Sequence, residues 1–124
     1  MRTLALTLIA AASLGLIANP ATAHPKLVAS SPVAGETARA PGAITLKFSE
    51  KLVAAFSGLS ITRLPGGSAN GKAAKVLKIY VSPDGRTLIA RLASPLQPGG
   101  YLVGWHVVSA DTHRVAGSLH FTAK

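Results

Sequence analysis

Short runs of alternating apolar and polar residues, each closed by glycine or proline, most constrain what this chain can fold into. In the run at residues 101–109, one face carries Tyr101, Val103, Trp105 and Val107, while His106 points the other way. Similar runs predict seven strands, at residues 27–30, 44–49, 58–63, 75–82, 87–92, 101–109 and 117–123. Helical structure is expected only as a turn around residues 53–56. The pattern therefore predicts an all-β domain, an antiparallel β-sandwich or a small barrel.

The first 23 residues have the features of a secretory signal peptide. Arg2 supplies the positive start, residues 4–18 form an apolar run, and Ala21-Thr22-Ala23 is a small-residue cleavage site. The apolar run is shorter than the roughly 20 residues needed to cross a bilayer as a helix. We therefore expect cleavage after Ala23, which leaves residues 24–124 as a single exported domain.

The exported domain is strongly basic and contains no cysteine. The full sequence has 13 Lys and Arg against 4 Asp and Glu, and only Arg2 leaves with the signal, so the net charge of the mature chain is +8. The cations are spread singly along the chain, which favours a solvated surface over a nucleic-acid site. Without cysteine there is neither a disulfide framework nor a thiolate metal site. Stability must come from packing.

Cleavage after Ala23 would make His24 the first residue of the mature protein. Its free α-amine and its ring Nδ1 could then chelate one metal ion, and Cu(II) is the divalent ion that nitrogen donors hold most tightly. The next residue, Pro25, has no backbone N–H that a copper ion could displace. The remaining ligands must therefore come from elsewhere in the fold.

Asp111 and His113 are the best candidates for these ligands. They are one residue apart, so in an extended segment both side chains would project to the same side. A carboxylate beside an imidazole suits the tetragonal nitrogen and oxygen preference of Cu(II). The spacing alone also allows a plain surface pair in a loop. A hydrolase that adds Ser109 to this pair is disfavoured, because the three residues are too close in sequence for the usual relay.

Four segments, in their order along residues 24–124, resemble the CopC family of periplasmic copper-binding proteins. They are His24-Pro25-Lys26-Leu27-Val28, Leu46-Lys47-Phe48-Ser49-Glu50, the run at 101–109, and Asp111-Thr112-His113 with Gly117. An N-terminal histidine combined with a late Asp-Thr-His is specific to that family. The resemblance implies a Greek-key β-sandwich or barrel of cupredoxin or immunoglobulin-like type, located in the periplasm and holding one Cu(II) per mature chain.

In the site that the resemblance implies, His24 gives its amine and ring nitrogen, His113 gives a second ring nitrogen, and Asp111 lies beside the metal. Glu50 falls where some family members place another acidic residue near copper; the alternative is a simple charge at the end of a strand. Some members also bind Cu(I) in a methionine-rich loop. Here Met1 is the only methionine, and the corresponding loop at 64–71 is rich in glycine, so we expect a Cu(II)-only protein with no Cu(I) methionine site.

The resemblance implies a non-enzymatic copper carrier or buffer that serves copper homeostasis or resistance. It suggests a monomer whose partner is an inner-membrane copper transporter of the CopD type, with no role for nucleic acid. One alternative is an enzyme similar to the histidine-brace copper monooxygenases, which a short chain with six aromatic residues and no aromatic-rich loop disfavours. A metal-free structural β-sandwich is the other alternative.

Overall fold

The computed structural model describes residues 24–64 and 71–124, which form strands joined by turns and a single short 3-10 helix. The predicted signal peptide and most of the predicted glycine-rich loop lie outside these residues. The elements are β1 (Leu27–Ser31), β2 (Thr37–Ala38), β3 (Ala43–Phe48), η1 (Ala54–Phe56), β4 (Gly58–Leu64), β5 (Lys72–Ala73), β6 (Val76–Val81), β7 (Thr87–Leu92), β8 (Gly99–Val108) and β9 (Arg114–Ala123).

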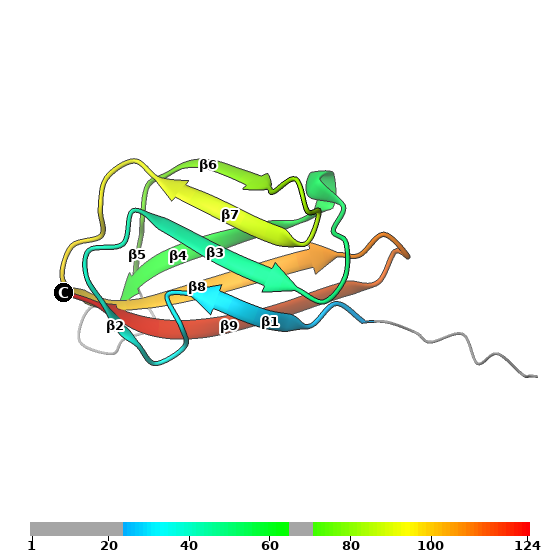
Figure 1. Cartoon of the computed structure of the whole chain (residues 1–124). Coiled ribbons are helices and arrows are strands. Elements are labelled where there is room, and N and C mark those ends of the chain that lie inside the picture. Colours follow the sequence, from blue (N-terminus) through cyan, green and yellow to red (C-terminus); the bar gives the residue numbers. More distant parts are fainter. Residues whose placement is uncertain (1–23, 65–70) are drawn as a thin grey trace, which may run out of the picture.

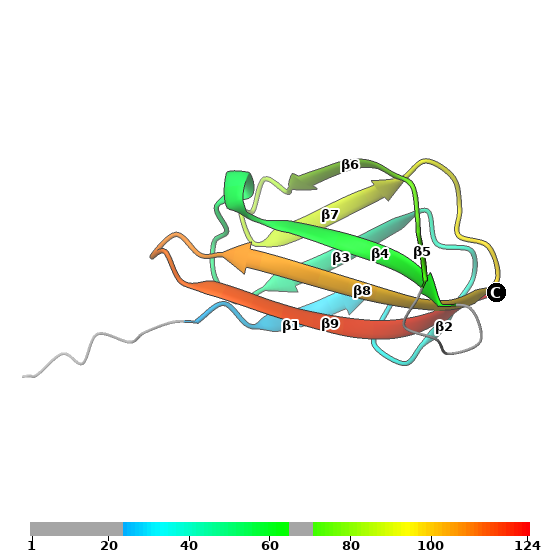
Figure 2. The same ribbon diagram turned by 180° about the vertical axis from the view of Figure 1, so that it is seen from behind.

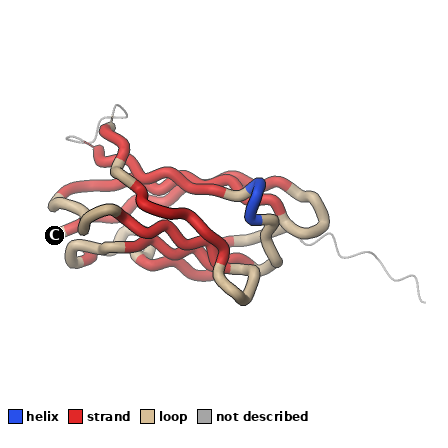
Figure 3. Tube along the Cα trace, turned by 90° about the horizontal axis from the view of Figure 1, so that it is seen from above, coloured by secondary structure: helices blue, strands red, loops and turns tan. Residues whose placement is uncertain are grey.

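The strands form two sheets packed face to face (Figures 1 and 2). The first has the order β1-β3-β7-β6 and the second the order β2-β9-β8-β4-β5. All pairings are antiparallel except the parallel pairing of β2 with β9. The two sheets do not join into a closed barrel, and the tube in Figure 3 is almost entirely strand and loop. The predicted all-β fold is therefore confirmed, as a sandwich.

The core lies between the sheets and follows the predicted alternation. In β3 the side chains of Ile44, Leu46 and Phe48 are at most 1% exposed, while Lys47 points to solvent. The strand β8 contributes Tyr101, Val103 and Val107 in the same way. Alternation at a period of two places one face of each strand against the opposite sheet. The hydrophobic effect therefore determines both the pairing register and which face of each strand is buried.

Different elements form the two ends of the sandwich. The start of β1, η1 and the turn between β8 and β9 gather at one end, and β5 and the C-terminus lie at the other (Figure 1). The two-residue strands β2 and β5 were not predicted, because two residues are too few to show a period. In the described part of the chain, no helix is long and apolar enough to cross a membrane.

Candidate metal centre

The backbone that enters β1 is fixed in place immediately after His24. The ring of Pro25 is fully buried, the N–H of Lys26 donates to the hydroxyl of Ser49 at 2.9 Å, and the N–H of Ser49 donates to the carbonyl of Lys26 at 2.8 Å. His24 itself is exposed. Because Ser49 directly follows β3, these contacts hold the start of β1, and with it His24, at the end of the first sheet.

The turn between β8 and β9 holds His113 at the same end. The N–H of Ser109 donates to the carbonyl of His113 at 2.9 Å, and the N–H of Thr112 donates to the carbonyl of Ser109 at 2.8 Å. Thr112 adopts φ +73°, a left-handed conformation that is uncommon for a β-branched residue. The segment is thus a tight turn and not the extended stretch that the i, i+2 argument assumed.

Asp111 and His113 nevertheless meet, because the turn folds one against the other. Oδ2 of Asp111 lies 2.9 Å from Nδ1 of His113, and its Oδ1 accepts a hydrogen bond from the buried hydroxyl of Ser109. The Ser109 hydrogen bond, followed by that of the His113 ring, lowers the pKa of the Asp111 carboxyl to about 2. The ionised carboxylate therefore keeps the ring proton on Nδ1 and leaves Nε2 of His113 free to bind a metal.

His24 and His113, which are far apart in the sequence, come into contact at this end of the sandwich. Their ring centroids are 4.6 Å apart and the rings meet edge to face at 80°. Across residues 24–64 and 71–124, no three side chains of His, Cys, Asp or Glu converge closely enough to hold a metal on their own. The four expected metal residues, His24, His113, Asp111 and Glu50, therefore do not form such a cluster. The expected donor set also includes the α-amine of His24, which is an amide until the bond to Ala23 is cut.

Glu50 lies to one side of the two histidines. It lines a surface pocket of about 240 Å³ together with Arg86 and Asp111, and neither histidine lines that pocket. Nearby, the guanidinium of Arg86 donates to the carbonyl of Ser49 at 2.5 Å. The structure thus brings Glu50 to the Asp111 side of the site without placing it between His24 and His113.

The order of the contacts in the turn does not suit a hydrolase. Ser109 is only 1% exposed, and its hydroxyl bonds to the carboxylate of Asp111, which in turn bonds to the ring of His113. A nucleophilic relay needs the imidazole between the hydroxyl and the carboxylate. Ser109 instead holds the carboxylate of Asp111 in place through its hydroxyl. Ser82 donates to Asp84 in the same way in the turn between β6 and β7, so a serine two residues before an aspartate is the sequence signal for this contact.

The remaining histidines and the tryptophan lie outside the contact between His24 and His113. His106 and His120 are exposed, as expected, and the ring of His106 packs against Gly58. Trp105 is half-buried: its ring covers Gly117 and meets the ring of Phe48 edge to face, with centroids 6.3 Å apart. A β-carbon at Gly117 would come within 2.6 Å of the indole, so this position requires glycine.

Comparison with known proteins places this chain in a family. A model of the CopC domain matches residues 27–124, the whole sandwich. The chain belongs to the CopC family. This CopC-family protein is 42% identical to copper resistance protein C of Xanthomonas campestris pv. juglandis over 99% of this chain and 97% of that protein. It is 43% identical, with the same coverage, to copper resistance protein C of Pseudomonas syringae pv. tomato.

Solved structures of CopC-family proteins have the same fold. The crystal structure of PcoC, a methionine-rich copper resistance protein from Escherichia coli, superposes with a TM-score of 0.75 at 36% identity, covering 82% of this chain and all of PcoC. CopC from Methylosinus trichosporium OB3b superposes with a TM-score of 0.68 at 30% identity, covering 82% of this chain and 94% of that one.

Proposed function

We propose that this CopC-family protein binds one Cu(II) ion per chain after residues 1–23 are removed. The contact between the rings of His24 and His113, with centroids 4.6 Å apart, carries the proposal. It brings the residue that cleavage would expose beside a second imidazole at the same end of the sandwich. The α-amine and Nδ1 of His24 and Nε2 of His113 form a nitrogen-rich donor set of the kind that Cu(II) prefers. The names of the relatives, copper resistance protein C, agree with copper as the cargo.

In this proposal Asp111 acts through His113. Its carboxylate holds the ring at Nδ1, and the ring therefore presents Nε2 in one orientation. Glu50 adds negative charge near the ion from the pocket that it shares with Asp111. Both carboxylates favour a dication at this end of the molecule, because they offset the charge that the ion brings.

The physiological role that we propose is that of a periplasmic copper carrier or buffer in copper resistance, not that of an enzyme. PcoC is described as methionine-rich, whereas this chain has a single methionine, Met1, at the start of the predicted signal peptide. Thioether sulfur is the donor that suits Cu(I), so we propose a Cu(II)-only protein. A monomer that exchanges copper with a CopD-type membrane transporter completes the proposal.

The free amine of His24 provides the decisive test. Protein that starts at His24 is compared with protein that carries one extra alanine ahead of it, and Cu(II) is titrated calorimetrically against a competing chelator. We expect one-to-one binding with the native start and its loss in the extended protein, as also in His113→Ala. His120→Ala, which changes an exposed histidine elsewhere, should bind as the unaltered protein does.

Fluorescence of Trp105 gives an independent reading, because it is the only tryptophan of the chain. Its emission should fall as Cu(II) is added and stay constant in the extended protein. Undiminished Cu(II) affinity after extension would refute the role given to the amine. A Cu(I) affinity that rivals the Cu(II) affinity would refute the Cu(II)-only assignment.

A further inference from the structure

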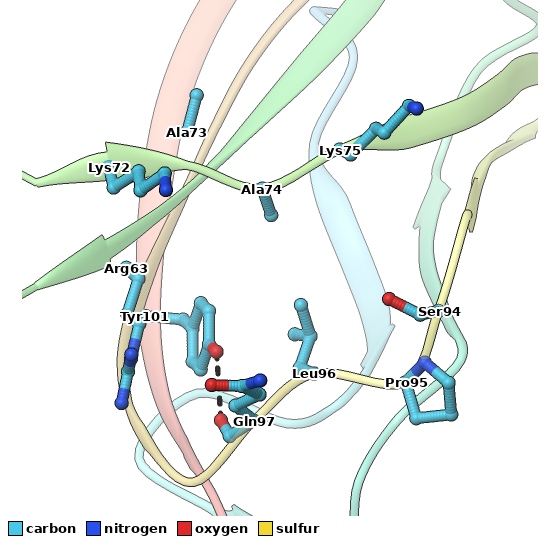
Figure 4. A pocket seen from close by; sticks show the side chains of 10 residues that line it. All are labelled: Arg63, Lys72, Ala73, Ala74, Lys75, Ser94, Pro95, Leu96, Gln97 and Tyr101. Atoms are coloured by element: carbon cyan, nitrogen blue, oxygen red, sulfur yellow. Dashed lines mark hydrogen bonds between the residues drawn. The ribbon is translucent and has the colours of Figure 1, made fainter.

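A second concave site lies at the end of the sandwich opposite His24 and His113. It is a cleft of about 340 Å³ between the segment that joins β5 to β6 and the segment that joins β7 to β8 (Figure 4). Its floor is apolar: Ala74 lies on one side, and Leu96 and Tyr101 are 7% and 3% exposed. The hydroxyl of Tyr101 donates to the carbonyl of Gln97 at 2.8 Å, so that the polar end of the ring already has its partner.

The rim of this cleft carries three cations, those of Arg63, Lys72 and Lys75. Arg63 and Lys72 are paired across β4 and β5, so their side chains start from neighbouring positions on the rim. The guanidinium of Arg63 donates through Nη2 to the carbonyl of Pro98 at 2.8 Å, and this bond fixes its position while leaving further N–H donors available. The position of the Arg63 guanidinium on the rim is therefore fixed before any ligand binds.

Within the described residues, no Asp or Glu side chain lines this cleft or forms an ion pair with these three cations. The chain has four Asp and Glu side chains. Glu50 and Asp111 share the pocket at the far end, and Asp84 lies in the adjoining β6–β7 turn, where it accepts the N–H of Arg86. Glu36 accepts the N–H of Val33 next to β2, on the opposite edge of the sheet from β5. The cleft thus has a net positive potential that attracts anions.

We propose that this cleft binds a small organic anion, a carboxylate carried on an apolar body. The carboxylate meets Arg63 and Lys72, whose N–H groups suit its two oxygens, and the apolar body packs on Leu96 and Tyr101. A volume of about 340 Å³ is at the lower end of the range for small-molecule sites, which fits a ligand of this size. The site is independent of copper, since it lies at the other end of the sandwich.

Benzoate is a suitable probe because it joins one carboxylate to one apolar ring, and benzamide is its neutral counterpart. Metal-free protein expressed from the full sequence is titrated with each while the backbone amide shifts are followed by NMR. We expect benzoate to give saturable shifts at Ala74 and Leu96, and benzamide to give none. Replacing both lysines, Lys72→Gln with Lys75→Gln, should weaken binding by up to about tenfold, since each exposed cation contributes modestly.

Lys47→Gln is the matched control, because it removes one exposed lysine from the outer face of β3 and leaves the cleft intact. Raising the ionic strength from about 0.01 M to about 0.15 M should also weaken benzoate binding, because the Debye length falls from about 30 Å to about 8 Å. Equal shifts with benzamide, unchanged affinity in the double variant, or no saturable shift would each overturn the proposal. Phosphate binding as tight as benzoate would refute the part given to the apolar floor.

Discussion

The substitution Asp111→Asn tests the proposal that the turn between β8 and β9 orients His113 for copper. The carboxylate accepts at both oxygens: Oδ1 from the hydroxyl of Ser109, with a long 3.4 Å contact to the N–H of His113, and Oδ2 from the ring Nδ1 at 2.9 Å. An asparagine offers one carbonyl oxygen in place of two. If that oxygen accepts from Ser109, the amide N–H faces Nδ1 of His113 and favours the tautomer with its proton on Nε2; if it faces the ring instead, it is a neutral acceptor in place of a charged one.

The expected loss follows from these contacts. With the carboxylate gone, the imidazole is no longer held with its proton on Nδ1, and it loses the negative charge that makes Nε2 a stronger donor. Removing such a partner of a metal-binding histidine typically lowers metal affinity by about 10 to 100-fold. The ring contact with His24 does not replace this support, because an edge-to-face contact at 4.6 Å fixes neither the tautomer nor the charge.

The assay is a competition titration of Cu(II) against a chelator of known affinity, on protein that starts at His24. Asp84→Asn is the matched control: Asp84 is also an exposed carboxylate held by a nearby serine, Ser82, and its pKa is likewise lowered to about 2. It braces the turn between β6 and β7 and should leave copper affinity unchanged. If Asp111→Asn binds Cu(II) as tightly as the unaltered protein, the orienting role of Asp111 is wrong.

Three further results are expected of the metal-free protein. In the folded protein, hydrogen bonds lower the pKa of Asp84 from 3.8 to about 2. As the pH falls, this carboxylate is therefore protonated in the unfolded state before it is protonated in the folded state. The free energy of unfolding should fall as the pH drops from about 4 to 2, and less steeply in Asp84→Asn. Gly117→Ala should displace the ring of Trp105, shift its fluorescence and destabilise the fold by about 1–3 kcal/mol; an unchanged spectrum would contradict the packing. In denaturant titrations, Leu46→Ala, at a side chain that is 0% exposed, should cost about 2–5 kcal/mol, whereas Leu77→Ala, at 69% exposure, should cost little.

The sequence predicted most of the fold because period-two alternation needs only a run of several residues to become visible. Strands β3 and β8 show it clearly, and their inward residues are those with the least exposure. Strands β2 and β5 carry no such signal, since each has two residues, and β2 pairs in parallel with a strand near the other end of the chain. Pairing of that kind depends on tertiary contacts that no local pattern records.

At the candidate site, the sequence indicated that Asp111 and His113 would lie close together, but not the turn that brings them together, and their part in copper binding stays a prediction. Asp111 and His113 were expected on one side of an extended segment, yet they meet because Thr112 turns the chain with φ +73°. The role of Ser109 was missed, although Ser82 and Asp84 repeat its spacing to Asp111 and its hydrogen bond. That His24 lies beside His113 followed from the family resemblance, since spacing alone says nothing about residues at opposite ends of a chain.

The positions of the two histidines also bear on how the fold is held together. His24 leads into β1 of one sheet, and His113 leads into β9 of the other, 89 positions later in the sequence. A metal ion shared by them would tie the two layers across nearly the whole chain, the kind of long-range cross-link that a disulfide provides in many exported domains. This chain has no cysteine. The bound copper ion would then also be a reversible cross-link between the two sheets. Each transfer of copper to a partner would remove this cross-link from the end of the sandwich that holds the two histidines.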